Sequence, residues 1–237
     1  MELARATWTA IEDQKVDVVL FPIGSTEQHG PHAPLGTDAY LAETVATRAA
    51  EQTDVTAVVA PGLPIGVSPE HRSFAGTIWV SASAFRTFVT EAVASLEAHG
   101  FDRVVLVNGH GGNMPAVREV AENLTRSHSM QCVSFTWFDA IDTGDVRMGH
   151  AGPVETSALL AARPDVVDCD RIAEAGEASV DRWGTWIGGT NVAVDTEEFA
   201  PNGVVGDPRL ADANTGEQLL AAAAERLCEV IDYVASS

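Results

Sequence analysis

The sequence predicts a layered α/β domain with a mostly parallel central sheet. Short apolar runs rich in valine recur through the first 135 residues, and segments with helical periodicity separate them. Runs of this kind are typical of parallel strands that are buried on both faces. Their regular alternation with helices is the pattern of βαβ units, in which helices cover a sheet.

Each element is expected at a defined place. The apolar runs predict strands over Val16–Ile23, Val55–Ala60, Arg103–Val107 and Gln131–Phe135. Apolar residues at helical spacing predict helices over Asp38–Glu51, Ala84–His99 and Met114–Ser127. Asp38 and Asn113 are expected as N-caps and Gly100 as a C-terminal stop. After Trp137 the alternation weakens, and we expect a loop, a short helix near Pro153–Ala162 and a final helix over about Asn214–Val234.

Length and composition indicate one domain, residues 1–237, because 46% hydrophobic residues suffice for one substantial core. No window approaches the roughly 20 apolar residues of a membrane span, and the N-terminus lacks the order of a secretory signal. We therefore expect a cytoplasmic protein without a membrane partner. The three cysteines lack CxxC spacing, which argues against a disulfide framework and a thiolate zinc site.

The charge is strongly acidic, with 34 acidic residues against 14 basic ones and a net charge of −20. Nucleic acid is not an expected partner, because the chain has no basic stripe to neutralise phosphates. Lys15 is the sole lysine. So acidic a chain resembles proteins of salt-accumulating halophiles, where a Debye length of about 3 Å at 1 M salt weakens self-repulsion.

The segment from Gly24 to Asp38 carries half of a candidate metal site. It offers Glu27, His29 and Asp38 in a loop rich in glycine and proline, between the first expected strand and the following helix. His110 and Glu155 are candidate ligands further along the chain. Imidazole nitrogen and carboxylate oxygen are ligands for Zn²⁺, Mn²⁺ and Fe²⁺. Taken together, these residues predict a centre of one or two divalent ions.

The expected topology brings these clusters together. Ile23 ends the first strand just before Glu27, and Val107 ends the third just before His110. Ligands of parallel α/β sheets gather beyond the carboxyl ends of the strands. Gly111 is expected to let the backbone approach a substrate, and the helix that starts after Asn113 to face a developing oxyanion.

Several residues keep two interpretations. His32 either lines the site or packs the loop, and Glu70 and His71 either touch ligands or substrate or are structural. Trp183 and Trp186 belong either to the core or an interface, or to a substrate lid.

The order of motifs resembles the creatininase (creatinine amidohydrolase) family. The matching segments are Gly24-Ser-Thr-Glu-Gln-His-Gly-Pro-His with Leu35-Gly-Thr-Asp, Ser68-Pro-Glu-His with Gly76-Thr-Ile, Asn108-Gly-His-Gly-Gly-Asn, His150-Ala-Gly with Glu155-Thr-Ser, and Gly203-Val-Val-Gly-Asp-Pro. The resemblance implies a three-layer α/β/α sandwich, a divalent metal centre, hydrolysis of a cyclic amide or other non-peptide C–N bond, and a homo-oligomer, commonly a hexamer.

The resemblance also assigns roles by motif position. Glu27, His29, Asp38 and His110 match metal ligands, with Asp38 as the bridge. His150 matches a proton-transfer histidine. Glu155 matches a carboxylate that orients water or completes the metal shell.

Two positions depart from creatininase itself. Gly112 stands where creatininase has a ligand glutamate, and Val146 stands where it has an aromatic residue over the substrate. Both departures argue against a fully occupied second metal site and against activity toward creatinine.

The resulting hypothesis is a metal-dependent amidohydrolase that uses a metal-activated water and a small-molecule amide substrate. Within the family, the His-Gly-Gly-Asn form resembles that of the archaeal formamidopyrimidine-nucleotide deformylase and of the mycofactocin precursor peptidase, and the halophile-like composition favours the archaeal deformylase. Three alternatives therefore stay open: such a deformylase of flavin or deazaflavin biosynthesis, a peptidase acting on a short modified peptide, and a non-catalytic metal-stabilised scaffold.

Overall fold

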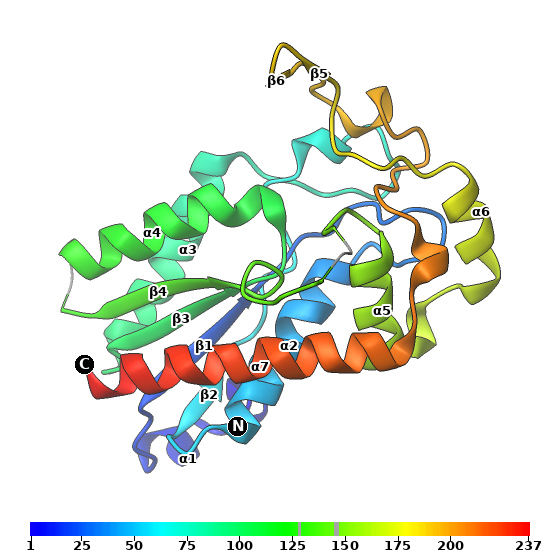
Figure 1. The fold of residues 1–237 in the computed structure, drawn as a ribbon. Coiled ribbons are helices and arrows are strands. Elements are labelled where there is room, and N and C mark those ends of the chain that lie inside the picture. The colour runs from blue at the N-terminus through cyan, green and yellow to red at the C-terminus, as the bar shows by residue number, and fades with distance from the viewer. Residues whose placement is uncertain (128, 145–146) are drawn as a thin grey trace.

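The computed structural model describes residues 1–127, 129–144 and 147–237. Its centre is a four-stranded parallel sheet in the order β2-β1-β3-β4 (Figure 1). The strands are β1 (Val18–Ile23), β2 (Ala57–Val59), β3 (Arg103–Asn108) and β4 (Gln131–Thr136). The chain leaves β1 toward β2 on one side and later returns to add β3 on the other. Such a reversal of strand order opens a crevice at the carboxyl ends of β1 and β3.

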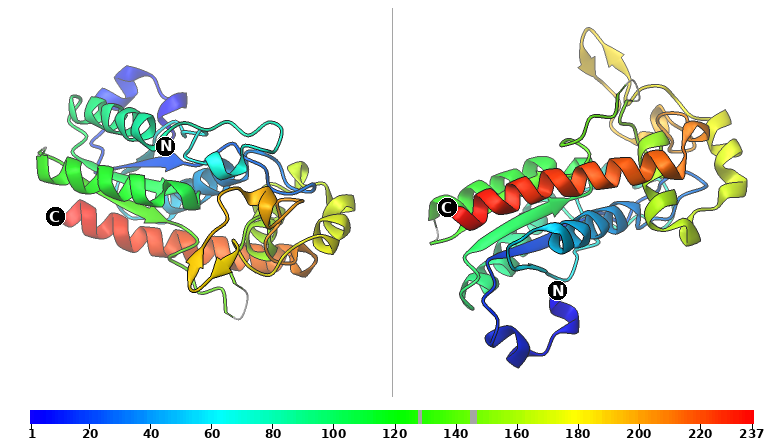
Figure 2. Two further views of the ribbon diagram at one scale, coloured as in Figure 1. Left: turned by 90° about the horizontal axis from the view of Figure 1, so that it is seen from above. Right: turned by 60° about the horizontal axis from the view of Figure 1, so that its bottom comes forward.

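Helices cover both faces of this sheet (Figures 1 and 2). The helices α2 (Thr37–Gln52), α5 (Pro153–Ala162) and α7 (Ala213–Ser236) share one hydrophobic cluster with alternate residues of β1 such as Val18 and Leu20. The helices α3 (Ala82–Glu97) and α4 (Met114–Ser127) share a second cluster with the intervening residues, such as Val19 and Phe21. Since side chains alternate across a strand, both faces of β1 are buried. This confirms the predicted three-layer α/β/α arrangement and parallel sheet.

The predicted elements are present, with ends that coincide or differ by at most two residues. Gly100 follows α3 with a φ of 82°, as expected of a left-handed C-terminal stop. The two predicted N-caps are wrong. Gly36 is the N-cap of α2, and Asp38 lies in the first turn with its carboxylate directed at two histidines. Asn113 closes a 3-10 turn before α4, and its side chain joins two loops rather than capping the helix.

Several small elements were not predicted. They are the helices α1 (Trp8–Glu12) and α6 (Ile172–Glu177) and a hairpin of β5 (Trp186–Ile187) and β6 (Thr190–Asn191) that projects from the body (Figure 1). Their brevity explains the omission, because two to six residues give little periodicity. The three cysteines are free, as expected. Within the described ranges, no helix has both the length and the apolarity to span a bilayer.

Candidate metal centre

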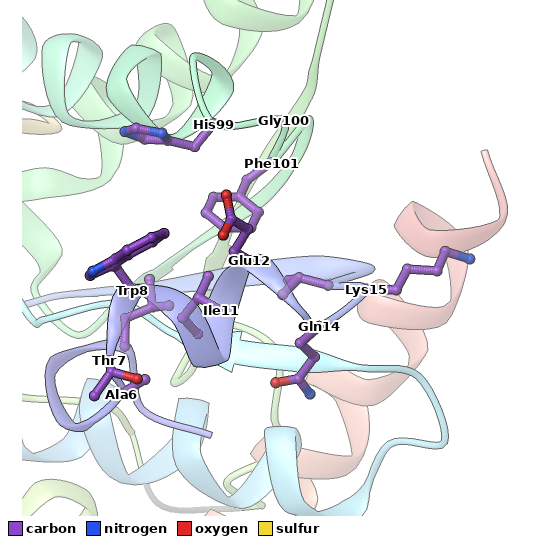
Figure 3. Close-up of a pocket in the computed structure, with 12 residues that line it drawn as sticks. Ala6, Thr7, Trp8, Ile11, Glu12, Gln14, Lys15, His99, Gly100 and Phe101 are labelled. Atoms are coloured by element: carbon purple, nitrogen blue, oxygen red, sulfur yellow. The ribbon is translucent and has the colours of Figure 1, made fainter.

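A cavity of about 400 Å³ opens beyond the carboxyl ends of β1 and β3, where the sequence-predicted ligands meet. Its lining includes Glu27, Asp38, His110, His150 and Glu155. A larger hollow of about 750 Å³ lies near the amino ends of the same strands, between α1 and the chain after α3, with Trp8 and Phe101 in its wall (Figure 3). Among the described residues, none of the buried clusters of carboxylates and imidazoles lies in this larger hollow. We therefore take the smaller cavity as the candidate functional site.

One candidate ligand set consists of Glu27, Asp38 and His110, which offer atoms within 4.8 Å of one another. The Nδ1 atom of His110 is 3.2 Å from Glu27 Oε1 and 3.2 Å from Asp38 Oδ2. The other ring nitrogen, Nε2, lies 3.0 Å from the carbonyl oxygen of Val67, to which it can donate. This hydrogen bond occupies Nε2 and leaves Nδ1 to face the carboxylates, which is the orientation of a metal-ligating histidine.

A second group of close donor atoms consists of His29, His150 and Glu155, and the other oxygen of Asp38 lies beside His29. The Nε2 atom of His29 is 3.1 Å from Asp38 Oδ1 and 3.9 Å from Glu155 Oε2. Its Nδ1 atom is 3.1 Å from the carbonyl oxygen of Glu27, which again leaves Nε2 for the cavity. Asp38 thus presents one oxygen to each set, which is the arrangement of a bridging carboxylate.

The donor atoms fit divalent cations. Both carboxylate oxygens of Glu27 and one of Asp38 are buried without a hydrogen-bond partner among the described residues. Buried carboxylate oxygens without partners are costly, and a cation removes that cost. Carboxylate oxygen with imidazole nitrogen is a donor set for Zn²⁺ or Mn²⁺.

The protonation states follow from this mixture of burial and charge. Burial raises the pKa of Glu27, but the neighbouring His110 and His71 together outweigh it and bring the value to about 2. Burial lowers the pKa of His29, but the carboxylates of Asp38, Glu155 and Glu27 together outweigh it and bring the value to about 9. The pKa of His110 is likewise raised, because the carboxylates of Glu27 and Asp38 together outweigh burial. Without metal, protons therefore occupy both ligand histidines at neutral pH.

His150 differs from the ligand histidines. Burial, followed by the nearby His29, holds the pKa of His150 well below 6.5, so the ring is neutral. Its Nε2 atom donates to the carbonyl oxygen of Gln28 at 2.7 Å, and its Nδ1 atom lies 3.8 Å from Glu27 Oε1. A neutral imidazole with a free Nδ1 lone pair in the cavity can accept a proton.

The turn after His150 holds Glu155 in place. Ala151 has a φ of 53°, a left-handed conformation that no other described non-glycine residue adopts. Its backbone N–H donates to Glu155 Oε2 at 2.5 Å. Burial raises the pKa of Glu155 to about 7. Strained backbone of this kind persists where the surrounding structure holds functional groups in place.

The remaining predicted residues lie around this centre. His71 lines the cavity 3.4 Å from Glu27 Oε1, and Gly111 lines it as well. His32 packs away from the lining, with Nε2 bonded to Thr156. The side chain of Asn113 links two loops of the site, because it accepts a hydrogen bond from the Val67 N–H and donates one to the Gly24 carbonyl.

Gln28 is a site residue that sequence reasoning missed. Its side-chain oxygen accepts from the Gly30 N–H, which orients its amide nitrogen toward His71 Nδ1 at 2.9 Å. His71 Nδ1 is therefore an acceptor, and its Nε2–H faces Glu27. The position of Gln28 between two predicted ligands was the available signal.

Three apolar residues complete the walls of the cavity: Phe138, Met148 and Trp183. The Trp183 ring stands edge-on to His71 and His150, with centroids 5.8 and 6.0 Å apart. Phe138 and Met148 had no sequence signal that set them apart from core residues. Val146, which stands where creatininase has an aromatic residue over the substrate, lies outside the described residues.

Comparison with known proteins places the chain in a family. The family described as creatininase (creatinine amidohydrolase) matches residues 4–231. The mycofactocin precursor peptide peptidase of Mycobacterium ulcerans is 37% identical over 213 residues, which cover 86% of this chain and 80% of that protein. The corresponding protein of Mycolicibacterium smegmatis is 36% identical and covers 87% and 81%.

Solved structures show the same likeness. A crystal structure of creatininase has a TM-score of 0.81 and 26% identity, and covers 97% of this chain and 96% of that one. Other similar structures are described as creatininase with Mn and as a mutant creatininase of a Zn–Zn type.

Proposed function

This chain belongs to the creatininase family of hydrolases, and from that premise we propose that it is a divalent-metal-dependent amidohydrolase that cleaves an amide bond in a short modified peptide. The observation that carries the proposal is the pair of ligand sets on either oxygen of Asp38, with the neutral ring of His150 beside them. The mycobacterial relatives named as precursor peptide peptidases support the choice of a peptide substrate.

In this proposal Glu27, Asp38 and His110 would hold one divalent ion, and His29, Asp38 and Glu155 would hold a second. Bound ions of this type polarise a carbonyl group and acidify water. We assign Zn²⁺, Mn²⁺ or Fe²⁺ to the sites, since all three accept this mixture of nitrogen and oxygen donors.

His150 transfers the proton in the proposed reaction. Its Nδ1 atom takes the proton of the attacking water and then gives it to the departing amine nitrogen, which completes hydrolysis of the C–N bond. The hydrogen bond from Nε2 to the Gln28 carbonyl keeps the lone pair of Nδ1 directed at the cavity. His71 holds Glu27 from the side, because its own Nδ1 is occupied by the Gln28 amide.

Substrate competition tests the proposal. Protein loaded with Zn²⁺, Mn²⁺ or Fe²⁺ in molar KCl is incubated with short peptides, the formamidopyrimidine ribonucleotide and creatinine, and products are identified by mass spectrometry. We expect peptide cleavage that disappears in Glu27→Gln. Formate release instead would establish the deformylase alternative, and ring opening of creatinine would establish a lactamase.

An Asp38→Ala variant provides the sharper control. Its carboxylate serves both ligand sets, so metal content and turnover should fall together. A variant that keeps its metal and its turnover would refute the assignment. Homo-oligomer formation, commonly a hexamer in this family, stays a prediction that light scattering of the metal-loaded protein can measure.

A further inference from the structure

Glu70 lines the metal cavity without a role in either ligand set. It lies in the 3-10 turn Pro69–His71, is half-buried, and forms no ion pair among the described residues. The nearest arginine along the chain, Arg72, is engaged by Asp195 at 2.5 Å. Glu70 therefore contributes a carboxylate to the cavity that the metal centre does not use.

This carboxylate lies beside Gly112. A Cβ atom built on Gly112 would lie 3.2 Å from Glu70 Oε1 and 2.5 Å from His110 Nε2. The absence of a side chain at Gly112 therefore leaves the space in which the Glu70 carboxylate stands beside the His110 ring. That places Oε1 next to one of the proposed metal ligands, within the same cavity.

Apart from the residues already given roles, Glu70 is the charged side chain of the described lining that can contact a polar group of a substrate. Once the two ligand sets, His71 and His150 are set aside, the described side chains of the lining are Phe138, Met148, Trp183 and Glu70, together with glycines. The first three offer apolar contact. A half-buried carboxylate has lost part of its hydration. A cationic ligand group restores favourable interactions to such a carboxylate.

We propose that Glu70 binds the protonated amino group of the substrate, so that the enzyme selects amides that carry a free amine close to the scissile bond. The inference rests on the proposed amide hydrolysis for its place in the reaction, but the binding it describes can be measured without turnover. Glu70 is a specificity-determining residue in this account, and the ions are held by other side chains.

Two metal-chelating probes test the proposal. Leucine hydroxamate carries a free α-amino group, and N-acetyl-leucine hydroxamate lacks its charge. Calorimetry at pH 7 on the Zn²⁺-loaded protein should give an affinity about tenfold higher for the free amine, as expected of one charge-assisted hydrogen bond. In Glu70→Gln the two affinities should agree within about twofold. The exposed Glu197→Gln variant, which keeps the cavity intact, should retain the preference.

Three results would overturn the proposal. They are equal affinities in the wild-type protein, a preference that survives in Glu70→Gln, and loss of bound Zn²⁺ from Glu70→Gln, which would make Glu70 a metal ligand. The two hypotheses fail separately. If no peptide is cleaved but the amine preference depends on Glu70, the proposed function falls and this inference stands. If peptides are cleaved without any amine preference, the inference falls alone.

Discussion

Metal binding to the metal-free protein should release protons, and their number follows from the pKa values of the candidate ligands. A raised histidine pKa favours the protonated form, and a metal ligand must be deprotonated. With a pKa of about 9, His29 is protonated in roughly 99% of molecules at pH 7. His110, whose pKa is also raised, adds roughly one further proton, and Glu155, with a pKa of about 7, adds about half of one. The expected total is roughly 2.5 protons per protein when both sets are filled.

Calorimetry can count these protons. Zn²⁺ is titrated into metal-free protein at pH 7 in buffers of different ionisation enthalpy, and the slope of the observed enthalpy against that quantity gives the number released. His29→Gln should release about one proton fewer. Because protons compete with the ion, the apparent affinity should fall as pH falls, by about tenfold per unit for each proton released. A slope near zero at pH 7 would refute the assignment of both histidines as ligands.

Four further predictions concern single features. His150→Gln should keep its metal but lose at least about 100-fold in kcat, because proton transfer contributes that much; turnover within threefold of wild type would contradict its role. Gly112→Ala, whose Cβ would lie 2.2 Å from the Val67 carbonyl oxygen, should cost about 1–3 kcal/mol in urea unfolding, and an unchanged midpoint would show that the loop yields. Asn113→Ala should lower the free energy of unfolding by about 2–3 kcal/mol, because it leaves the Val67 N–H and the Gly24 carbonyl without their partner; a loss under 0.5 kcal/mol would mean that water replaces it. Because the net charge is −20, the melting temperature should rise between 0.1 and 2 M KCl, and a fall would remove the halophilic interpretation.

The sheet and its covering helices could be predicted from the sequence because their signal is local. Valine-rich runs such as Arg103–Asn108 and the helix Met114–Ser127 carry a clear period, and their order fixes which strand ends meet. The clustering of Glu27, Asp38 and His110 followed from that topology. The hairpin at Trp186–Asn191 is too short to carry such a period.

The finer features of the site depend on packing that no local pattern encodes. The cap predictions failed because the carboxylate of Asp38 and the amide of Asn113 find partners far along the chain, at His110 and Gly24. Gln28 likewise acts through Gly203, whose carbonyl it contacts across 175 positions of sequence. Such contacts are set by tertiary structure, which overrides the local preference of polar residues for caps.

In the proposed function Asp38 would serve both ligand sets. Anomalous diffraction from crystals of the Mn²⁺- or Zn²⁺-loaded protein tests this most directly. We expect two peaks, one among Glu27, Asp38 and His110 and the other among His29, Asp38 and Glu155. Peaks coordinated by other residues, or none in a crystal whose solution contains excess metal, would contradict it.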